Sequence, residues 1–128
     1  MDSLLLAVGL VMISFITLKL LSKKKHIPPA VLSQSLKDLK AAAQLQPGHA
    51  ILELHKIFVH SLKKTSSSTQ NAAKVIEPFA KRFPNEKDVW YFHRMRNRAA
   101  HEPNFKATPR DRQKAYEVYK RALESLGK

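Results

Sequence analysis

The sequence predicts an all-α protein, with a single N-terminal transmembrane helix followed by a four- to five-helix bundle. Three observations support this fold class. Residues 4–18 carry no charged side chain. Beyond residue 30, apolar residues recur every three or four positions and never alternate with period two over a useful length. Proline, glycine and short polar runs divide this part into segments of helical length. The 128-residue chain therefore has room for one small domain behind the apolar segment.

The apolar segment is expected to be a membrane anchor. A spanning helix needs roughly 20 mostly apolar residues, and the run from Ser3 to Leu21 comes close to that length. A cleaved signal peptide would begin with positive charge and end in small residues, which this segment does not. We therefore expect residues 1–25 to form an uncleaved anchor with a basic edge, made of Lys19, Lys23, Lys24 and Lys25. The alternative is a hydrophobic helix buried in the bundle, which the lack of any polar face disfavours.

The charges around the anchor predict its orientation. The lysines follow the apolar run, whereas Asp2 precedes it. Positive loops stay on the cytoplasmic side of a membrane. We therefore expect a single-pass membrane protein whose C-terminal domain lies in the cytoplasm.

The part after the anchor is predicted to have two sections. Residues 26–47 are expected to be a linker, stiffened by Pro28 and Pro29, and a first amphipathic helix. Residues 48–128 are expected to form the main helical domain. Gln46-Pro47-Gly48 separates the two. The apolar stripe of the first helix comprises Leu32, Leu36, Leu39 and Ala43, and that of the second comprises Ile51, Leu54, Phe58 and Leu62. The stripe of the third helix comprises Ala72, Val75, Ile76, Phe79 and Phe83, and that of the last comprises Ala115, Val118, Tyr119, Ala122 and Leu126.

Capping signals predict the helix ends. The last residues of the polar run 65–69 are suited to cap the third helix. Asn85 is suited to cap the fourth helix, because Asp88 follows it three residues later. Pro103 must end the fourth helix. Thr108, followed by proline and an acid in the first turn, predicts the start of the last helix.

The charge of the chain predicts a polyanionic partner. The net charge is +13, and residues 26–128 alone carry 19 Lys and Arg against nine Asp and Glu. Such a field attracts nucleic acid or an anionic lipid surface, although solvated lysine faces that only aid solubility are the alternative. The chain has no cysteine, which excludes disulfides and thiolate metal sites. His49, His55 and His60 lack zinc-enzyme spacing and are interpreted as surface or interface histidines, so neither a metal nor a cofactor is predicted.

The segment 86–102 has the most distinctive side chains. On a helical wheel, Phe92, Met95 and Ala99 form a core stripe flanked by Val89 and Tyr91. The opposite side holds Trp90, Arg94, Asn97 and His101, with His93 and Arg98 beside them, and Arg96 lies at the border.

These side chains favour chemistry on a phosphate. Three arginines with one nearby acid suit an anion, because the guanidinium fork matches phosphate oxygens. Histidine exchanges protons near neutral pH. RNA cleavage needs a base, a cation and an acid, and this helix carries side chains suited to all three roles. Arg94, Arg98 and His93 are predicted to bind nucleic acid. Alternatively, the His101 imidazole only complements the helix dipole and the arginines only cover the core.

The run Arg96-Asn97-Arg98-Ala99-Ala100-His101 resembles the Arg-polar-x-x-x-His signature of the HEPN superfamily of helical RNases and nucleic-acid-associated domains. The resemblance spans residues 48–126, including the aromatic stretch 90–95. It implies a homodimer in which the Arg and His of both protomers meet in one cleft. It also implies metal-independent cleavage, with the 2′-hydroxyl as nucleophile and a cyclic phosphate as product. Arg96 would stabilise the phosphate, His101 would act as base or acid, and Asn97 would orient them.

Three functions remain open from the sequence. The first is a membrane-anchored HEPN-type endoribonuclease that, by family analogy, acts in defence or stress. The second is a non-catalytic HEPN-like module that holds RNA or a protein partner at the membrane, as many family members do. The third is a structural adaptor whose basic residues bind anionic lipid. Pro103 stands where nucleotidyltransferase-paired toxins of the family usually have Tyr, which argues against that class.

Overall fold

A computed structural model describes residues 25–128, which form five α-helices and no strand. The all-helical prediction is thereby confirmed for this part of the chain. None of these five helices has the length and apolarity that a bilayer crossing requires. The predicted anchor, with Lys19, Lys23 and Lys24, lies outside the described residues except for Lys25. The helices are α2 (Pro29–Ala42), α3 (Pro47–Ser66), α4 (Ala72–Ala80), α5 (Glu86–His101) and α6 (Pro109–Ser125).

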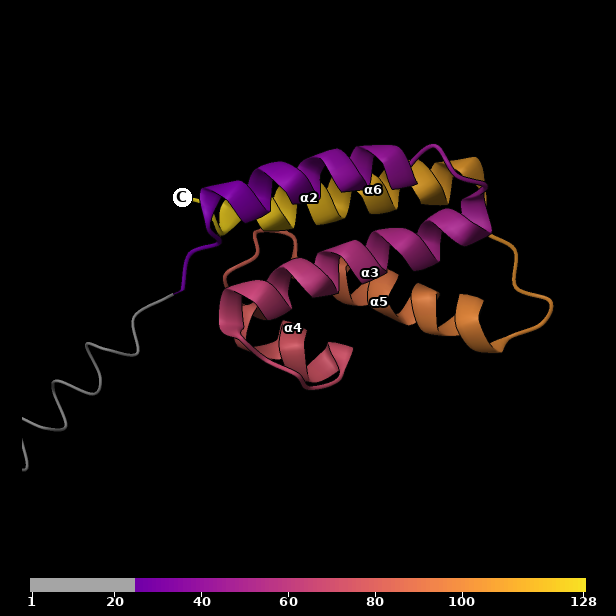
Figure 1. The fold of residues 1–128 in the computed structure, drawn as a ribbon. Helices are drawn as coiled ribbons and strands as arrows, with labels where there is room; N and C mark the ends of the chain where they lie inside the picture. The colour runs from indigo at the N-terminus through magenta and orange to yellow at the C-terminus, as the bar shows by residue number, and fades with distance from the viewer. Residues whose placement is uncertain (1–24) are drawn as a thin grey trace, which may run out of the picture.

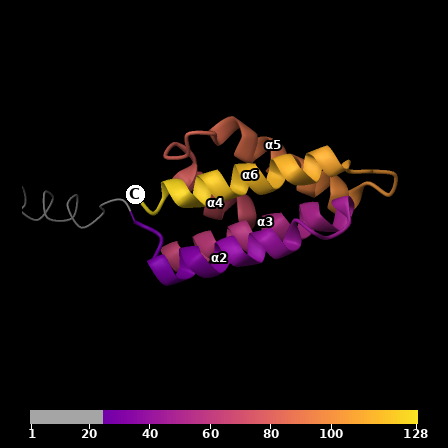
Figure 2. The same cartoon turned by 90° about the horizontal axis from the view of Figure 1, so that it is seen from above.

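Helix α3 is the centre of the bundle and contacts each of the other four helices. Helices α2 and α6 run side by side along one flank of α3, while α5 and the short α4 lie on the other (Figures 1 and 2). Helix α2, in the section 26–47, packs against both α3 and α6 and buries Leu39 and Ala42 in the common core. The first amphipathic helix is therefore a layer of the same bundle as residues 48–128.

The core follows the predicted apolar stripes. Phe58 of α3 stacks on Tyr119 of α6 with ring centroids 4.6 Å apart, and Phe83 lies 5.7 Å from Phe58. The helical wheel of α5 is wrong at two positions. Tyr91, expected beside the core, is 48% exposed, and Trp90, expected on the polar side, is half-buried against the core. Both differences arise because α5 packs against α3, α4 and α6, so its buried face is set by three neighbours.

The predicted linker is held to the body of the fold. The Ile27 side chain is buried, and its backbone N–H donates to the Leu126 carbonyl at 3.1 Å. Arg82 donates from Nη1 to the Lys25 carbonyl at 2.7 Å. The described chain therefore begins at the end of the bundle where α6 finishes (Figure 1).

The helix caps are partly as predicted. Thr108 and Asp111 form a reciprocal capping box at the start of α6, and α5 ends at His101 before Pro103. The expected cap of α4 is wrong, because Asn71 and not the end of the 65–69 run accepts from the Lys74 N–H. Asn85 precedes α5 but makes no side-chain cap. Its amide Nδ2 donates at 3.0 Å to the Val118 carbonyl, and its Oδ1 is buried without a hydrogen-bond partner among the described residues.

Candidate nucleic-acid interface

The inner face of α5 is joined to α3 by a pair of histidines. His55 Nε2 and His93 Nδ1 lie 2.9 Å apart, and the His55 side chain is almost fully buried. The prediction that His55 is a surface or interface histidine is wrong. It lies one turn from Ile51 and Phe58, so it projects from the same face of α3 as the core stripe, and the edge of its ring meets Tyr119. Register with the apolar stripe is the signal that would have located it.

Burial and nearby cations keep this pair neutral. Desolvation, reinforced by His93 and Arg96, lowers the pKa of His55 from 6.5 to about 3. Desolvation first, and then Arg96 and Arg94, also lower the pKa of His93. Burial raises the pKa of the Tyr119 hydroxyl, and the Arg96 charge opposes this only in part. At neutral pH one imidazole therefore donates its N–H to the other, so the tautomers of His55 and His93 are coupled.

Arg96 is half-buried beside this pair, on the inner side of α5. Its Nη1 donates to Asn97 Oδ1 at 3.3 Å. Within residues 25–128 it forms no ion pair with a carboxylate, although its charge acts on both histidines and on Tyr119. A guanidinium with one of its five N–H donors engaged retains the capacity to bind an anion.

His101 lies elsewhere on the same helix. It is exposed in the last turn of α5, and it has no side-chain hydrogen bond or ion pair to another described residue. Residues five positions apart on a helix point about 140° from one another. The fold of one chain thus brings Arg96 together with Asn97, His93 and His55, but does not bring His101 onto the same face.

The remaining predicted RNA-binding arginines occupy the outer face of α5. Arg98 pairs with Glu102 at 3.4 Å, and its guanidinium lies 5.0 Å from the centre of the Phe105 ring. Arg94 is exposed and lines a small hollow of about 180 Å³ with Tyr91 and Arg98. Two of the three arginines therefore face away from the histidine pair.

A larger groove runs between α3 and α5 and ends at the start of α4. Its volume is about 770 Å³. Sequence reasoning missed this groove, whose cationic side chains from α3 are Lys56 and Lys63. Their spacing with His60, four and then three residues, puts all three on one helix face and is the signal that could have revealed it. His55 and Arg96 also line the groove.

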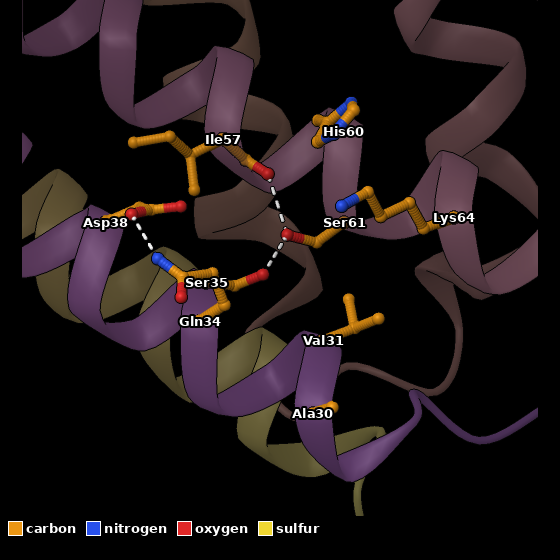
Figure 3. Close-up of a pocket in the computed structure, with 9 residues that line it drawn as sticks. All are labelled: Ala30, Val31, Gln34, Ser35, Asp38, Ile57, His60, Ser61 and Lys64. Carbon is orange, nitrogen blue, oxygen red and sulfur yellow. Dashed lines mark hydrogen bonds between the residues drawn. The ribbon is translucent and has the colours of Figure 1, made fainter.

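A second hollow, of about 260 Å³, lies between α2 and α3 (Figure 3). The hydroxyls of its two buried serines are both hydrogen-bonded. Ser61 donates to the Ile57 carbonyl at 2.8 Å and shares a hydrogen bond of 2.5 Å with Ser35. Asp38 accepts from Gln34 at 2.9 Å. Because neither serine is bonded to a base, these hydroxyls have a packing role.

The described residues contain no group of three or more His, Asp or Glu side chains placed to hold a metal ion. What the site offers is a concentration of cations and histidines around α5 and the facing side of α3. Comparison of the chain with protein-family models, with curated proteins and with solved structures finds no match.

Proposed function

We propose that this protein is a membrane-anchored endoribonuclease of HEPN type that cleaves RNA as a homodimer without a metal ion. The proposal rests on the positive charge of Arg96, which no carboxylate of the described residues balances. This half-buried cation has no carboxylate partner among residues 25–128, and it lies on the helix that holds the whole Arg-to-His signature. A phosphate supplies the missing negative charge.

The catalytic unit requires two chains. Arg96 and His101 of one protomer point to different faces of α5, so we place Arg96 of one protomer opposite His101 of its partner. One basic imidazole withdraws the proton of the 2′-hydroxyl, and that oxygen attacks the adjacent phosphorus. The bond from phosphorus to the 5′-oxygen breaks while Arg96 stabilises the negative charge on the phosphate. The same imidazole, now protonated, gives the proton to the leaving oxygen, which yields a 2′,3′-cyclic phosphate and a 5′-hydroxyl.

The outer face of α5 would hold the strand on either side of the cleavage point. Arg94 and Arg98 contact phosphates in this arrangement. The exposed Tyr91 ring lies beside them and is suited to stack on an unpaired base. The basic anchor edge would keep the domain at the cytoplasmic face of the membrane, next to anionic headgroups.

The alternative is a non-catalytic module that binds RNA or a protein partner at the membrane. It is favoured by the same separation of Arg96 and His101, because a chain that never forms the composite cleft keeps the phosphate-binding cation but lacks an acid or base beside it. Both functions require Arg96, and only cleavage requires His101.

The test uses the full chain purified in a mild detergent and incubated with RNA in EDTA. Wild type should cleave, whereas Arg96→Ala and His101→Ala should each lose most activity. The control Arg110→Ala removes an exposed arginine outside α5 and should cleave normally. If the intact protein does not cleave, or if both variants cleave as wild type does, the ribonuclease proposal is wrong.

Mixing the two inactive variants tests the composite site. Two-fold symmetry gives the dimer two such Arg96–His101 pairs, and a heterodimer of Arg96→Ala and His101→Ala keeps one of them intact. Random exchange of subunits in a symmetric dimer should then restore about a quarter of the wild-type rate. A mixture that stays inactive although subunits exchange would show that the two residues do not act across the interface.

A further inference from the structure

The groove between α3 and α5 contains more positive charge than its surroundings balance. Lys56, Lys63 and Arg96 line it, and among residues 25–128 Glu53 is the one carboxylate that does so. Glu53 lies 3.8 Å from the His49 imidazole, one turn back along α3. Within the described chain, none of the three cations pairs with a carboxylate. Three cations around one concave surface repel one another unless an anion binds between them.

Apart from Asn71, the other lining side chains are apolar or aromatic. Leu52, Val59, Ala72 and Ala100 contribute apolar surface, and the exposed His60 ring lies between Lys56 and Lys63 in the helical register. A flat ring packs on such a surface, and a histidine stacks on bases. The groove volume of about 770 Å³ is within the usual range for small-molecule sites. The groove is open to solvent, so a ligand can extend out of it.

We propose that this groove binds a nucleotide, with the phosphate held by Lys56, Lys63 and Arg96 and the base packed on the apolar wall beside His60. The neutral His55 closes the inner wall, and α4 begins at the rim with its positive dipole end. Because Arg96 is shared, the proposal deepens the RNA function proposed above. It adds a binding surface on α3, at residues outside the Arg-to-His signature.

The test measures binding of 5′-AMP to the full chain at one fixed salt concentration. Trp90 serves as a probe, because it is the only tryptophan and its ring lies 5.6 Å from His93, which is bonded to the groove residue His55. Lys56→Gln/Lys63→Gln should weaken 5′-AMP binding about tenfold, the loss expected for two ionic contacts in an open, solvated groove. The matched control Lys37→Gln/Lys64→Gln removes the same charge from exposed positions outside the groove and should change affinity less than about twofold.

Two further probes separate the phosphate from the base. Adenosine should bind more weakly than 5′-AMP and should be insensitive to the lysine substitutions. Inorganic phosphate should compete with 5′-AMP in the wild type. The proposal is overturned if 5′-AMP does not bind, if it binds no better than adenosine, or if the control pair loses as much affinity as the groove pair.

An uncleavable 2′-O-methyl oligoadenylate identifies the source of the nucleotide. If Lys56→Gln/Lys63→Gln weakens the binding of the oligomer and of 5′-AMP to the same extent, the groove holds part of an RNA strand. Weakening of 5′-AMP alone supports a free nucleotide. Binding of 5′-AMP breaks no bond, so a wild type that binds 5′-AMP through Lys56 and Lys63 but cuts no RNA keeps the groove proposal and loses only the ribonuclease. Loss of cleavage and loss of groove binding are therefore distinguishable.

Discussion

Replacing His55 with leucine should remove a large part of the acid sensitivity of the fold. His55 is almost fully buried, and its pKa falls from 6.5 to about 3 on folding. Below pH 6.5 the unfolded chain binds a proton at this position while the folded chain does not. The stability that depends on neutral His55 is therefore fully present above pH 6.5 and is lost as the pH falls from 6.5 towards 3.

The size of the effect follows from the two pKa values. Each pH unit between them costs about 1.4 kcal/mol of unfolding free energy. Between pH 7 and pH 4.5, His55 alone should remove about 2.5 kcal/mol, a large share of the stability of a domain this small. His93, whose pKa is also lowered, adds to the loss in both proteins.

Urea denaturation followed by far-UV circular dichroism at these two pH values measures the effect. The loss of stability on acidification should be smaller in His55→Leu than in wild type by about 2.5 kcal/mol. Carboxylates titrate in both proteins, so their contributions to the loss of stability cancel when the two losses are compared. His60→Leu, which removes an exposed histidine of the same helix, should retain the wild-type loss. Equal losses in His55→Leu and wild type would refute the assignment of a buried neutral histidine.

Four other changes should have effects of predictable size. Phe58→Ala empties a fully buried site and should destabilise the fold by about 3–5 kcal/mol in urea denaturation; less than about 1 kcal/mol would contradict the core described here. Asn85→Ala removes the hydrogen bond from Nδ2 to the Val118 carbonyl and should lower the free energy of unfolding by about 1 kcal/mol; an unchanged free energy would contradict that bond. Thr108→Ala removes the capping box of α6 and should lower the free energy of unfolding by about 1 kcal/mol, with a lower urea midpoint. Arg94→Gln should reduce the slope of log K against log salt for single-stranded RNA by about 0.7, and an unchanged slope would exclude a phosphate contact.

Much of the fold could be predicted from local pattern. The four apolar stripes correspond to α2, α3, α4 and α6, and proline marks the first turn of α2, α3 and α6. Thr108 and Asp111 form the predicted capping box because both partners lie within one turn. The α4 cap shows the limit of this approach. Asn71 and the preceding polar run are all suitable capping residues, and the start of the helix at Ala72 selects Asn71.

The site could be predicted only in part. Periodicity placed Arg96 at the edge of the polar face, and the structure places it half-buried beside His93. The residues around Asn85 suit a helix cap, but its side chain bonds instead to a carbonyl 33 residues away. The neighbouring sequence cannot show this, because the bond depends on how α6 packs against α5. The groove was also missed, since it needs α3, α4 and α5 together.

The sequence by itself determined that this chain is helical, where most of its helices begin and end, which stripes form the core, and that α5 carries an unusual excess of arginine and histidine. These properties depend on contacts within one or two helical turns, which the order of residues specifies directly. Only the tertiary structure decided that His55 meets His93, that Arg96 joins them while His101 does not, and that Lys56 and Lys63 share a groove with Arg96. Those pairings join separate helices, and their geometry comes from the packing of whole helix faces around α3.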